Sequence, residues 1–417
     1  MRRSITYHAS FLNRILSTLG KLLILFGLLS LAVIATIPGG GESISDDSAK
    51  ELNNCTKISE SGVYKLAADL DGESDEPCLE IIGTDSVVLD GNGFTINDAG
   101  FGLEIRGSSN VTIKNFTINN SEISGIGVFA SNSIDIRSNR ISNTGRVETW
   151  RNNSIHIWDS GEVEIRDNTV VNTLGYSDGV YVGKSNSVKI AGNHIENASF
   201  RGVGVLQSNN IDIFGNTVQN PGTIGWGIMM HNVLNVTARD NLINRALYGI
   251  EAKQNSTDVL IRGNYISNTT LCSIEAEGHN PEESEYPGRV SNVVIENNVI
   301  ESAGPLGVWV NTSNIIVRNN TVKNAIGLGM YIQGIDGPVE IYGNVFINST
   351  SAAIRINDTQ DHLYIYENEF RQLETGLRIL NTANIRIERN QFVDVDQVYE
   401  ERNTSGNEKQ NNIITTS

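Results

Sequence analysis

The chain has 417 residues, of which 19% are charged, and a formal net charge of −17 at pH 7. This length allows two or three ordinary domains or one long array of repeats. The negative charge argues against nucleic acid and anionic membrane surfaces as partners, because both are polyanions. Asn, Ser, Thr and Gly are abundant, so the expected surface is polar and largely neutral.

The chain opens on a targeting segment. Arg2, Arg3 and Lys21 precede an uncharged apolar run of sixteen residues, 22–37. This length suits the core of a signal peptide and is short for a membrane span of ~20 residues. Residues 1–42 are therefore predicted to be a signal peptide, cleaved after Ala35, or an uncleaved membrane-anchor helix. Both alternatives predict a secreted or cell-surface protein, the second one attached to the membrane.

Three cysteines follow this segment. Cys55 and Cys78 bracket one short stretch, and export to an oxidising compartment makes a disulfide between them reasonable. Cys272 is left over, and its place in the repeat pattern predicts a buried thiol that points inward. N-x-S/T sequons, for example at Asn235, permit glycosylation in an exported chain.

One phrase recurs thirteen times along the chain: apolar-x-apolar-x-x-Asn-x-apolar, as in "IDIRSNRI" and "VEIRDNTV". Phe116 replaces the Asn in one copy, and successive copies are mostly 22 to 25 residues apart. In the other twelve copies the Asn falls at 92, 139, 168, 193, 216, 241, 264, 298, 320, 344, 368 and 390. Alternation with a period of two indicates a strand with one buried face. The repeat therefore predicts a β-solenoid in which the same strand stacks on itself, coil after coil.

A second phrase, Gly-apolar-x-apolar, follows each Asn phrase, as in "GVYV" and "GIEA". Gly, Asn or Asp usually precedes the repeated Asn, and these residues tolerate the left-handed conformation of a sharp corner. An Asn repeated at one corner can donate to the Asn of the next coil and so satisfy a buried amide. Parallel crossovers are almost always right-handed, so an all-β, single-stranded, right-handed parallel β-helix of about 13 coils is expected.

These phrases resemble the repeats of the right-handed parallel β-helix proteins in the pectin-lyase-like superfamily, especially the carbohydrate-binding and sugar-hydrolase (CASH) domains and the NosD-like proteins. The stretch from Cys55 to Ile96 is similar to the N-terminal cap and first coil of secreted members. The resemblance implies a cap over residues 43–86, a parallel β-helix over 87–395 and a polar C-terminal tail over 396–417. It is specific for the fold and does not specify the activity.

The register predicts which side chains point outward from the Gly-apolar-x-apolar strand. Glu251 should lie one coil from Glu275, and Lys253 should lie beside Glu277 in the same way. Aromatic side chains flank these acids on the same face, and aromatic rings stack on the apolar faces of sugars. The predicted substrate-binding residues are His156, Trp158, Tyr181, Trp309, Tyr331 and Gln333. Two insertions, one with Trp150 and one after Gly278, are expected to form walls on opposite edges of this face.

The first hypothesis is an enzyme that acts on an extracellular polysaccharide as a lyase, an epimerase or a hydrolase. Its candidate catalytic residues are Glu251, Glu275, Glu277, Lys253 and His231, with His279 nearby. Close carboxylates separate into acid and base by repulsion, and Ca²⁺ is the cofactor that such oxygen ligands would suit. The alternative for each residue is a solvated face of paired Glu and Lys. Asp178 lies in a segment faintly like one motif of the polygalacturonases, but the companion motifs of that family are missing.

Two further hypotheses stay open, and both describe a monomeric exported protein. The chain could be a non-catalytic adhesion rod that binds glycans through its aromatic side chains alone. It could also handle copper, as the NosD resemblance implies, through Met229 and His231. A separate column of arginines on the Asn-phrase strand is best explained by ion pairs between coils, and the alternative is a track for an anionic glycan. This column comprises Arg137, Arg166, Arg239, Arg262 and Arg318.

Overall fold

The computed structural model describes residues 49–146, 152–222, 224–278, 288–312, 314–335, 337–359 and 362–416. The predicted export segment 1–42 lies outside the described residues, as do most of both insertions, residues 147–151 and 279–287. The chain divides into Met1–Asp46 and Asp47–Ser417, and the second unit contains every described strand. All regular elements of the described residues are strands, and none of these residues forms a helix able to cross a membrane.

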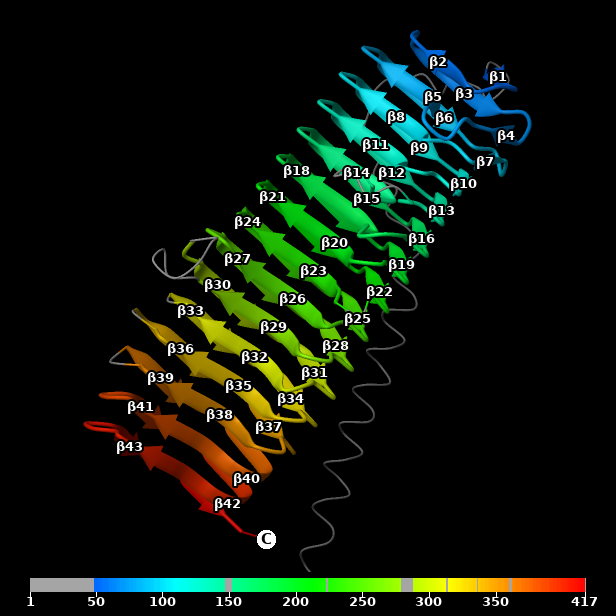
Figure 1. The fold of residues 1–417 in the computed structure, drawn as a ribbon. Helices are drawn as coiled ribbons and strands as arrows, with labels where there is room; N and C mark the ends of the chain where they lie inside the picture. Colours follow the sequence, from blue (N-terminus) through cyan, green and yellow to red (C-terminus); the bar gives the residue numbers. More distant parts are fainter. Residues whose placement is uncertain are drawn as a thin grey trace, which may run out of the picture. The chain divides into compact units, whose positions relative to one another are not determined.

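The strands stack in parallel, each on its counterpart in the next coil, from β1 to β44 (Figure 1). A 16-stranded sheet, called the first sheet below, is formed by the strands of the Asn phrase. Its strands are β1 (Lys50–Leu52), β3 (Gly62–Leu66), β6 (Asp85–Asp90), β9 (Ser109–Lys114), β12 (Asn132–Arg137), β15 (Gly161–Arg166), β18 (Asn186–Ala191), β21 (Asn209–Phe214), β24 (Leu234–Arg239), β27 (Thr257–Arg262), β30 (Ser291–Glu296), β33 (Ile315–Arg318), β36 (Val339–Tyr342), β39 (Leu363–Tyr366), β41 (Arg386–Glu388) and β43 (Glu408–Gln410).

A 28-stranded sheet contains two further rows, a short one and a long one. The short row is β4 (Leu70–Asp71), β7 (Thr95–Asn97), β10 (Thr117–Asn119), β13 (Arg140–Ser142), β16 (Thr169–Val171), β19 (His194–Glu196), β22 (Thr217–Gln219), β25 (Leu242–Asn244), β28 (Tyr265–Ser267), β31 (Val299–Glu301), β34 (Thr321–Lys323), β37 (Val345–Ile347) and β44 (Ile413–Thr415).

The long row carries the Gly-apolar-x-apolar phrase. Its strands are β2 (Thr56–Ile58), β5 (Pro77–Ile82), β8 (Phe101–Arg106), β11 (Ser124–Phe129), β14 (Ile155–Trp158), β17 (Val180–Gly183), β20 (Arg201–Leu206), β23 (Trp226–His231), β26 (Tyr248–Lys253), β29 (Cys272–Glu277), β32 (Leu306–Asn311), β35 (Leu328–Gln333) and β38 (Ala352–Asn357). The last two strands, β40 (Glu369–Leu380) and β42 (Gln391–Arg402), run through both rows. The predicted all-β parallel β-helix is confirmed.

The interior of the coils is a continuous apolar core that consists mainly of Ile and Val. β-Branched residues pack well on pleated strands, so each inward position stacks on the same position of the next coil. Near the C-terminal end the core is aromatic: the ring centroids of Phe346 and Phe370 lie 5.5 Å apart and those of Phe370 and Phe392 lie 4.7 Å apart. In these stacks, the buried ring of one coil packs against the ring of the next coil.

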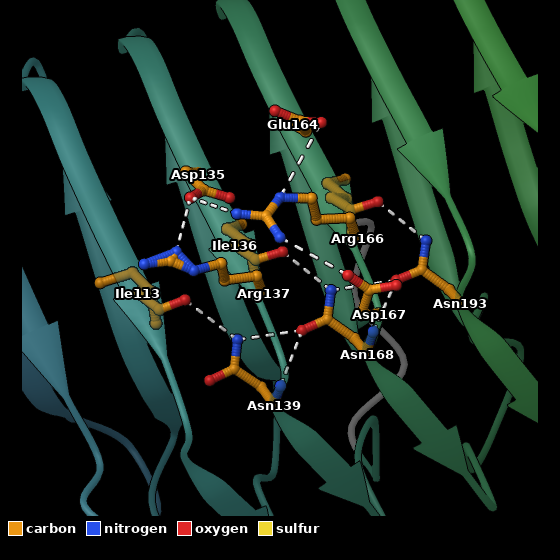
Figure 2. A network of polar contacts seen from close by, with 11 residues as sticks. Ile113, Asp135, Ile136, Arg137, Asn139, Glu164, Arg166, Asp167, Asn168 and Asn193 are labelled. Atoms are coloured by element: carbon orange, nitrogen blue, oxygen red, sulfur yellow. Dashed lines mark hydrogen bonds and ion pairs between the residues drawn. The ribbon is translucent and has the colours of Figure 1, made fainter. Parts of the chain in front are cut away.

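The repeated Asn forms a buried ladder at one corner of the coils (Figure 2). The Asn139 side-chain amide donates to Asn168 Oδ1 at 3.0 Å, and that of Asn168 donates to Asn193 Oδ1 at 3.0 Å. Each side-chain amide also donates to a main-chain carbonyl, for example Asn168 to Ile136 at 2.9 Å. From Asn139 onward, the corner residue before each Asn of the ladder has a left-handed backbone, as at Asp167 with φ 55°. The predicted ladder and its turn residues are confirmed over this part, whereas Asn92 is exposed, is itself left-handed with φ 52°, and lies outside the ladder.

The stack extends beyond the predicted boundaries at both ends. β1 pairs in parallel with β3, and β3 pairs in parallel with β6, so coils begin inside the predicted cap. Cys55 and Cys78 in this region are joined by a disulfide with a Cα–Cα distance of 4.4 Å. At the other end, the predicted polar tail 396–417 instead supplies the end of β42 and all of β43 and β44. Asn390 continues the ladder by donating to Asn412 Oδ1 at 3.1 Å. Polar side chains conceal this last copy of the repeat in the sequence.

Candidate functional site

The long row presents three columns of side chains outside the core. We call these columns leading, central and trailing, in the order in which their residues occur along each strand. The residues of one column are register partners on successive coils. The leading column contains Arg201, Trp226, Tyr248, Cys272 and Leu306. The central column contains His156, Tyr181, Gly204, Met229, Glu251, Glu275, Trp309 and Tyr331. The trailing column contains Trp158, Gly183, Leu206, His231, Lys253, Glu277 and Asn311, and Gln333 follows in β35.

The leading column escaped prediction because strict alternation fails at the Gly of the phrase. A Cβ on Gly227 would lie 2.5 Å from Gly249 O and 2.5 Å from the Ile243 side chain, so this position faces the interior. The next residue, Ile228, is also in the core. Two consecutive residues therefore face inward, and the residue before them, Trp226, lies outside.

The position of Cys272 corrects one prediction. Its thiol is buried, as expected, but it lies outside the core cluster and is the register partner of Tyr248 in the leading column. Side chains that pair in register on parallel strands point to the same face, so Cys272 points outward rather than inward. Burial raises its pKa well above the usual thiol range, and the charges of Glu275 and Glu251 add to the effect. This thiol is consequently unreactive.

The predicted acidic residues meet around one lysine. Glu251 pairs in register with Glu275, and Lys253 pairs with Glu277, as the repeat predicts. Lys253 Nζ lies 2.8 Å from Glu275 Oε1, 2.9 Å from Glu277 Oε2 and 3.4 Å from Glu251 Oε2. His231 Nε2 lies 2.5 Å from Glu251 Oε1. All five predicted catalytic residues thus form one cluster, called the Lys253 cluster below.

Burial in this cluster corrects the expectation of exposed side chains. Glu251 is 1% exposed and Glu275 is 0% exposed, although both point away from the core. Glu251 is enclosed by polar partners, since Trp226 Nε1 also donates to its Oε2 at 2.7 Å. Glu275 lies between its register partners Glu251 and Trp309, and its Oε1 lies 2.8 Å from Lys253 Nζ. A solvated face of surface ion pairs therefore does not describe these acids.

The two central glutamates differ in protonation. Burial favours the neutral form of Glu251, but the hydrogen bond with His231 and the charge of Lys253 outweigh burial and lower its pKa to about 2. Burial also favours the neutral form of Glu275, and the negative charge of Glu251 adds to it, so its pKa rises to about 9. At neutral pH these two glutamates are accordingly one ionised carboxylate and one carboxylic acid on adjacent coils.

Lys253 stays charged despite its surroundings. Burial alone would lower the pKa of its ammonium group, but the charges of Glu251 and Glu275 raise that pKa above the usual value. Its side chain is 18% exposed and that of His231 is 14% exposed, so these two are more accessible than either central glutamate. A ligand that approaches the face meets Lys253 and His231 before it meets the acids.

The predicted binding residues fall into two groups on either side of the Lys253 cluster. Trp309 follows Glu275 in the central column, and its ring centroid lies 6.2 Å from that of Tyr331, whose hydroxyl donates to Gln333 Oε1 at 2.8 Å. In the other group, the centroids of His156 and Tyr181 lie 5.0 Å apart and those of Trp158 and Tyr181 lie 6.3 Å apart. Gly204 and Met229 separate Tyr181 from Glu251 in the central column. Only the first group therefore adjoins the cluster.

Sequence reasoning missed a third aromatic pair. The rings of Trp226 and Tyr248 are stacked with centroids 5.3 Å apart and an interplanar angle of 8°. Burial and the charge of Glu275 raise the pKa of Tyr248 to about 12, so its phenol is protonated. Both residues stand directly before the Gly of the phrase, and this place in the sequence could have identified them as outward-facing. Strict alternation had instead assigned that position to the interior.

An ion pair also lies on this face. Arg201 Nε donates to Asp178 Oδ1 at 2.7 Å, over the bare backbone of Gly204. A Cβ on Gly204 would come within 2.6 Å of Asp178 Oδ2. Burial raises the pKa of Asp178, and the charge of Arg201 opposes this effect. This pair fills the gap in the central column between Tyr181 and Met229.

The residues of this face do not fit a bound metal ion. Lys253 Nζ already lies among the three carboxyl groups that would hold Ca²⁺. Met229 is buried and its sulfur accepts from Arg201 Nη1 at 3.4 Å, while His231 contacts Glu251, so the predicted copper ligands have protein partners. Within the described ranges, no group of three or more His, Cys, Asp or Glu residues could hold a metal ion. His279 and Trp150 lie outside these ranges.

Two family models match the chain. Residues 86–287 match the model described as periplasmic copper-binding protein (NosD), and residues 285–414 match the model described as right handed beta helix region. The stacked parallel coils agree with the right-handed β-helix that the second model describes, and the first match shows NosD-like repeats over residues 86–287. No curated protein matches the chain in sequence.

Several solved structures are similar to the chain at low sequence identity. PfbA, a surface adhesin of Streptococcus pneumoniae, is 14% identical, with 78% of this chain and 83% of that chain covered and a TM-score of 0.48. The periplasmic alginate epimerase AlgG is 12% identical, with 85% and 78% covered and a TM-score of 0.43. The A-module of the Azotobacter vinelandii mannuronan C-5 epimerase AlgE6 is 16% identical, with 87% and 91% covered and a TM-score of 0.34.

Proposed function

We propose that the chain is an exported protein that binds a polysaccharide along the long row and cleaves or rearranges it at the Lys253 cluster. The observation that carries this proposal is the placement of Glu251 and Glu275, register partners on adjacent coils, around Lys253, with surroundings that shift their pKa values in opposite directions. Two titratable groups whose surroundings push their pKa values apart are suited to act as acid and base. Export is supported by the predicted signal peptide or anchor and by the periplasmic protein named in one matching family model.

In this proposal Glu275 is the general acid. Its pKa of about 9 keeps a proton on the carboxyl group at neutral pH, ready for the bridging oxygen of a glycosidic bond. Glu251 remains ionised, orients His231 and holds Lys253. Lys253 covers Glu275, so the substrate must draw the ammonium group away. A carboxylate on the sugar can do so by competing with Glu275, which favours an acidic polysaccharide.

The aromatic pairs supply the binding platform. Trp309 and Tyr331 follow the cluster along the stack, and Trp226 and Tyr248 lie in the leading column beside it. Sugar rings stack on such surfaces through their apolar C–H faces. Successive coils are ~4.8 Å apart, close to the length of one sugar unit, so a polysaccharide that follows the stack meets one side chain of each column per sugar.

A second candidate function is glycan binding without catalysis. The burial of Glu251 and Glu275 favours it, because a buried and mutually compensated cluster can be purely structural. The same aromatic pairs would then bind the glycan by themselves. Under this alternative the protein is a surface adhesion rod, and no covalent change occurs in the bound polysaccharide.

One experiment separates the two functions. The protein is incubated with a panel of acidic and neutral polysaccharides, and new reducing ends and unsaturated products are followed. Product formation that is lost in Glu275→Gln supports the enzyme, whereas binding without product that survives Glu275→Gln and fails in Trp309→Ala supports the adhesin. Glu104→Gln is the matched control, since Glu104 is also a buried glutamate of the long row and pairs with Arg106 far from the cluster.

A further inference from the structure

The first sheet has a surface hollow of about 460 Å³ on the strands β18 to β27. It belongs to a different sheet from the Lys253 cluster, so a ligand bound there is independent of the proposed function. Three cations and one acid contribute to its lining, together with neutral amide groups. The residues on which its chemistry depends are Lys189, Asp212, Arg239, Arg262, Asn210 and Asn235.

The cations of this hollow are incompletely neutralised. Arg239 Nη2 lies 2.9 Å from Asp212 Oδ2, and Arg239 also contacts Asp240 at 3.4 Å. Neither Lys189 nor Arg262 has an ion-pair partner within the described part of the chain. Arg239 and Arg262 are moreover register partners, so two like charges lie on adjacent coils. Such a pair is destabilising unless an anion lies between or beside the two groups.

The acids that lie in register with these two cations do not pair with them. Glu164, the register partner of Lys189 on the preceding coil, lies 3.9 Å from Arg166. Glu296 is the register partner of Arg262 on the next coil, but its Oε2 accepts from Arg318 Nε at 2.7 Å. Asp212 is the register partner of Lys189, but it pairs with the arginine of the following coil. Lys189 and Arg262 therefore keep donors that an external anion can use.

Other arginines in the same column have carboxylate partners. Arg137 and Arg166 are also register partners, but both contact Asp135 Oδ2, at 3.0 and 3.1 Å (Figure 2). Arg166 has a further carboxylate, Asp167, at 3.5 Å. The prediction of ion pairs between coils therefore holds for that pair, whereas Arg262 makes no such contact with any described acid. The hollow is a place where the column presents unsatisfied positive charge.

Neutral polar groups complete the lining. The Asn210 side-chain amide donates to Asn186 Oδ1 at 2.7 Å, and the Asn235 amide donates to Asn210 Oδ1 at 2.7 Å. These bonds hold a row of amides along the stack. The hydroxyl of Thr237 lines the hollow as well. Amides and hydroxyls are suited to sugar hydroxyl groups, while guanidinium and ammonium groups are suited to carboxylates or sulfates.

We propose that this hollow binds an acidic oligosaccharide, with Lys189 and Arg262 contacting its carboxylate or sulfate groups. Two unpaired cations lining one hollow, on a chain with a net charge of −17, give this patch a charge opposite to that of the whole protein. The net charge would repel a long nucleic acid, and the lining has no aromatic side chain on which a base could stack. A short acidic glycan segment matches both the cations and the amide row.

The test is a binding titration of the full chain with three hexasaccharides: oligogalacturonate, a heparin fragment and neutral maltohexaose. We expect the acidic probes to bind and the neutral probe not to bind, with affinity that falls as salt rises. Oligogalacturonate and heparin distinguish a carboxylate site from a sulfate site. In Arg262→Gln and in Lys189→Gln, the dissociation constant should rise about tenfold, as for the loss of one charge-assisted hydrogen bond.

Arg140→Gln is the matched control, because Arg140 is an exposed arginine on β13, outside the hollow, without an ion-pair partner among the described residues. Unchanged binding in Arg140→Gln together with weakened binding in Arg262→Gln supports the site. Equal weakening in all three variants, equal affinity for maltohexaose, or tighter binding of a single-stranded oligonucleotide than of either acidic probe would overturn it. The weakening caused by Arg262→Gln and Lys189→Gln reports the hollow alone, whereas product formation reports the Lys253 cluster, so failure of one proposal is distinguishable from failure of the other.

Discussion

Glu251 and Glu275 occupy the same position on adjacent coils, yet their pKa values lie on opposite sides of the ordinary glutamate value, at about 2 and about 9. The difference arises from their partners. Lys253 contacts both glutamates, but Glu251 also has His231 and Trp226 as hydrogen-bond partners, whereas Glu275 has the charge of Glu251 beside it. Adjacent carboxyl groups in one column cannot both ionise without cost, and the one with more polar partners ionises first.

Replacing Glu275 by Gln should stabilise the protein at alkaline pH. Because the folded-state pKa of Glu275 is raised, the folded state binds one proton more than the unfolded state between about pH 4.5 and 9. The stabilisation that arises from the raised pKa of Glu275 is complete below pH 4.5. It is lost as pH rises from 4.5 to about 9, by at most about 1.4 kcal/mol per pH unit. The free-energy difference between Glu275→Gln and wild type, measured by urea unfolding, should therefore grow from pH 5 to 9. A difference that is independent of pH would contradict the raised pKa.

Enzymatic activity, if the Lys253 cluster is catalytic, should persist across neutral pH. Protonated Glu275 is required as the acid, so activity falls as pH rises through about 9, and ionised Glu251 is lost only as pH falls through about 2. The pH profile of kcat/KM reports these groups in the free enzyme. If kcat/KM instead fell as pH rises through about 4 to 5, the acid would be a carboxyl group with an ordinary pKa.

Replacing Glu251 by Gln should have the opposite effect on stability. It leaves the charge of Lys253 with one anionic partner fewer and removes the negative charge beside His231, which typically costs ~3 kcal/mol for a buried pair. The same change removes the charge that raises the pKa of Glu275, so that pKa should fall. Carbon NMR of the Glu275 carboxyl group measures the shift, and an unchanged pKa would mean that burial alone sets its value.

The Asn ladder should contribute strongly to stability. Asn241 Oδ1 accepts from the main chain and the side chain of Asn216, and its own amide donates to Asn264 and Ile213. Asn241→Ala leaves several buried polar groups unpaired, so a loss of ~3 kcal/mol is expected in urea unfolding. The half-buried Asn244, at the end of β25, is the control, and Asn244→Ala should cost less than ~1 kcal/mol. Equal losses would mean that the ladder has no special role.

The Gly of the second phrase should tolerate a side chain poorly. A Cβ on Gly227 would meet backbone oxygen at 2.5 Å, so Gly227→Ala must shift the neighbouring coil and should cost more than ~2 kcal/mol. Ser273 occupies the equivalent slot in its own coil with its hydroxyl 2.7 Å from Thr269, so Ser273→Gly is the control. If Gly227→Ala unfolds at the same urea concentration as wild type, the inward direction of this slot is wrong.

Much of this fold could be predicted from the sequence because the same phrase recurs along the chain. One strand with a period of two is ambiguous, but thirteen aligned copies fix the register, and so Glu251 beside Glu275 was predictable. Burial was not predictable, since it depends on how Trp226 and Lys253 pack over the acids. The outward position of Trp226 was also hidden, because alternation breaks where Gly227 turns toward the core. At the C-terminal end Asn412 lies among polar residues that obscure the repeat.

The Asn ladder has a direction, since each amide donates toward the coil that follows it, from Asn139 through to Asn412. Every step is chemically the same as the one before. A whole coil could therefore be removed or duplicated, and the ladder would close again: without residues 193–215, Asn168 would meet Asn216 in place of Asn193. The number of coils is thus free to change by whole units, and the distance between the Lys253 cluster and either end of the stack can lengthen or shorten without disturbing the chemistry at its centre.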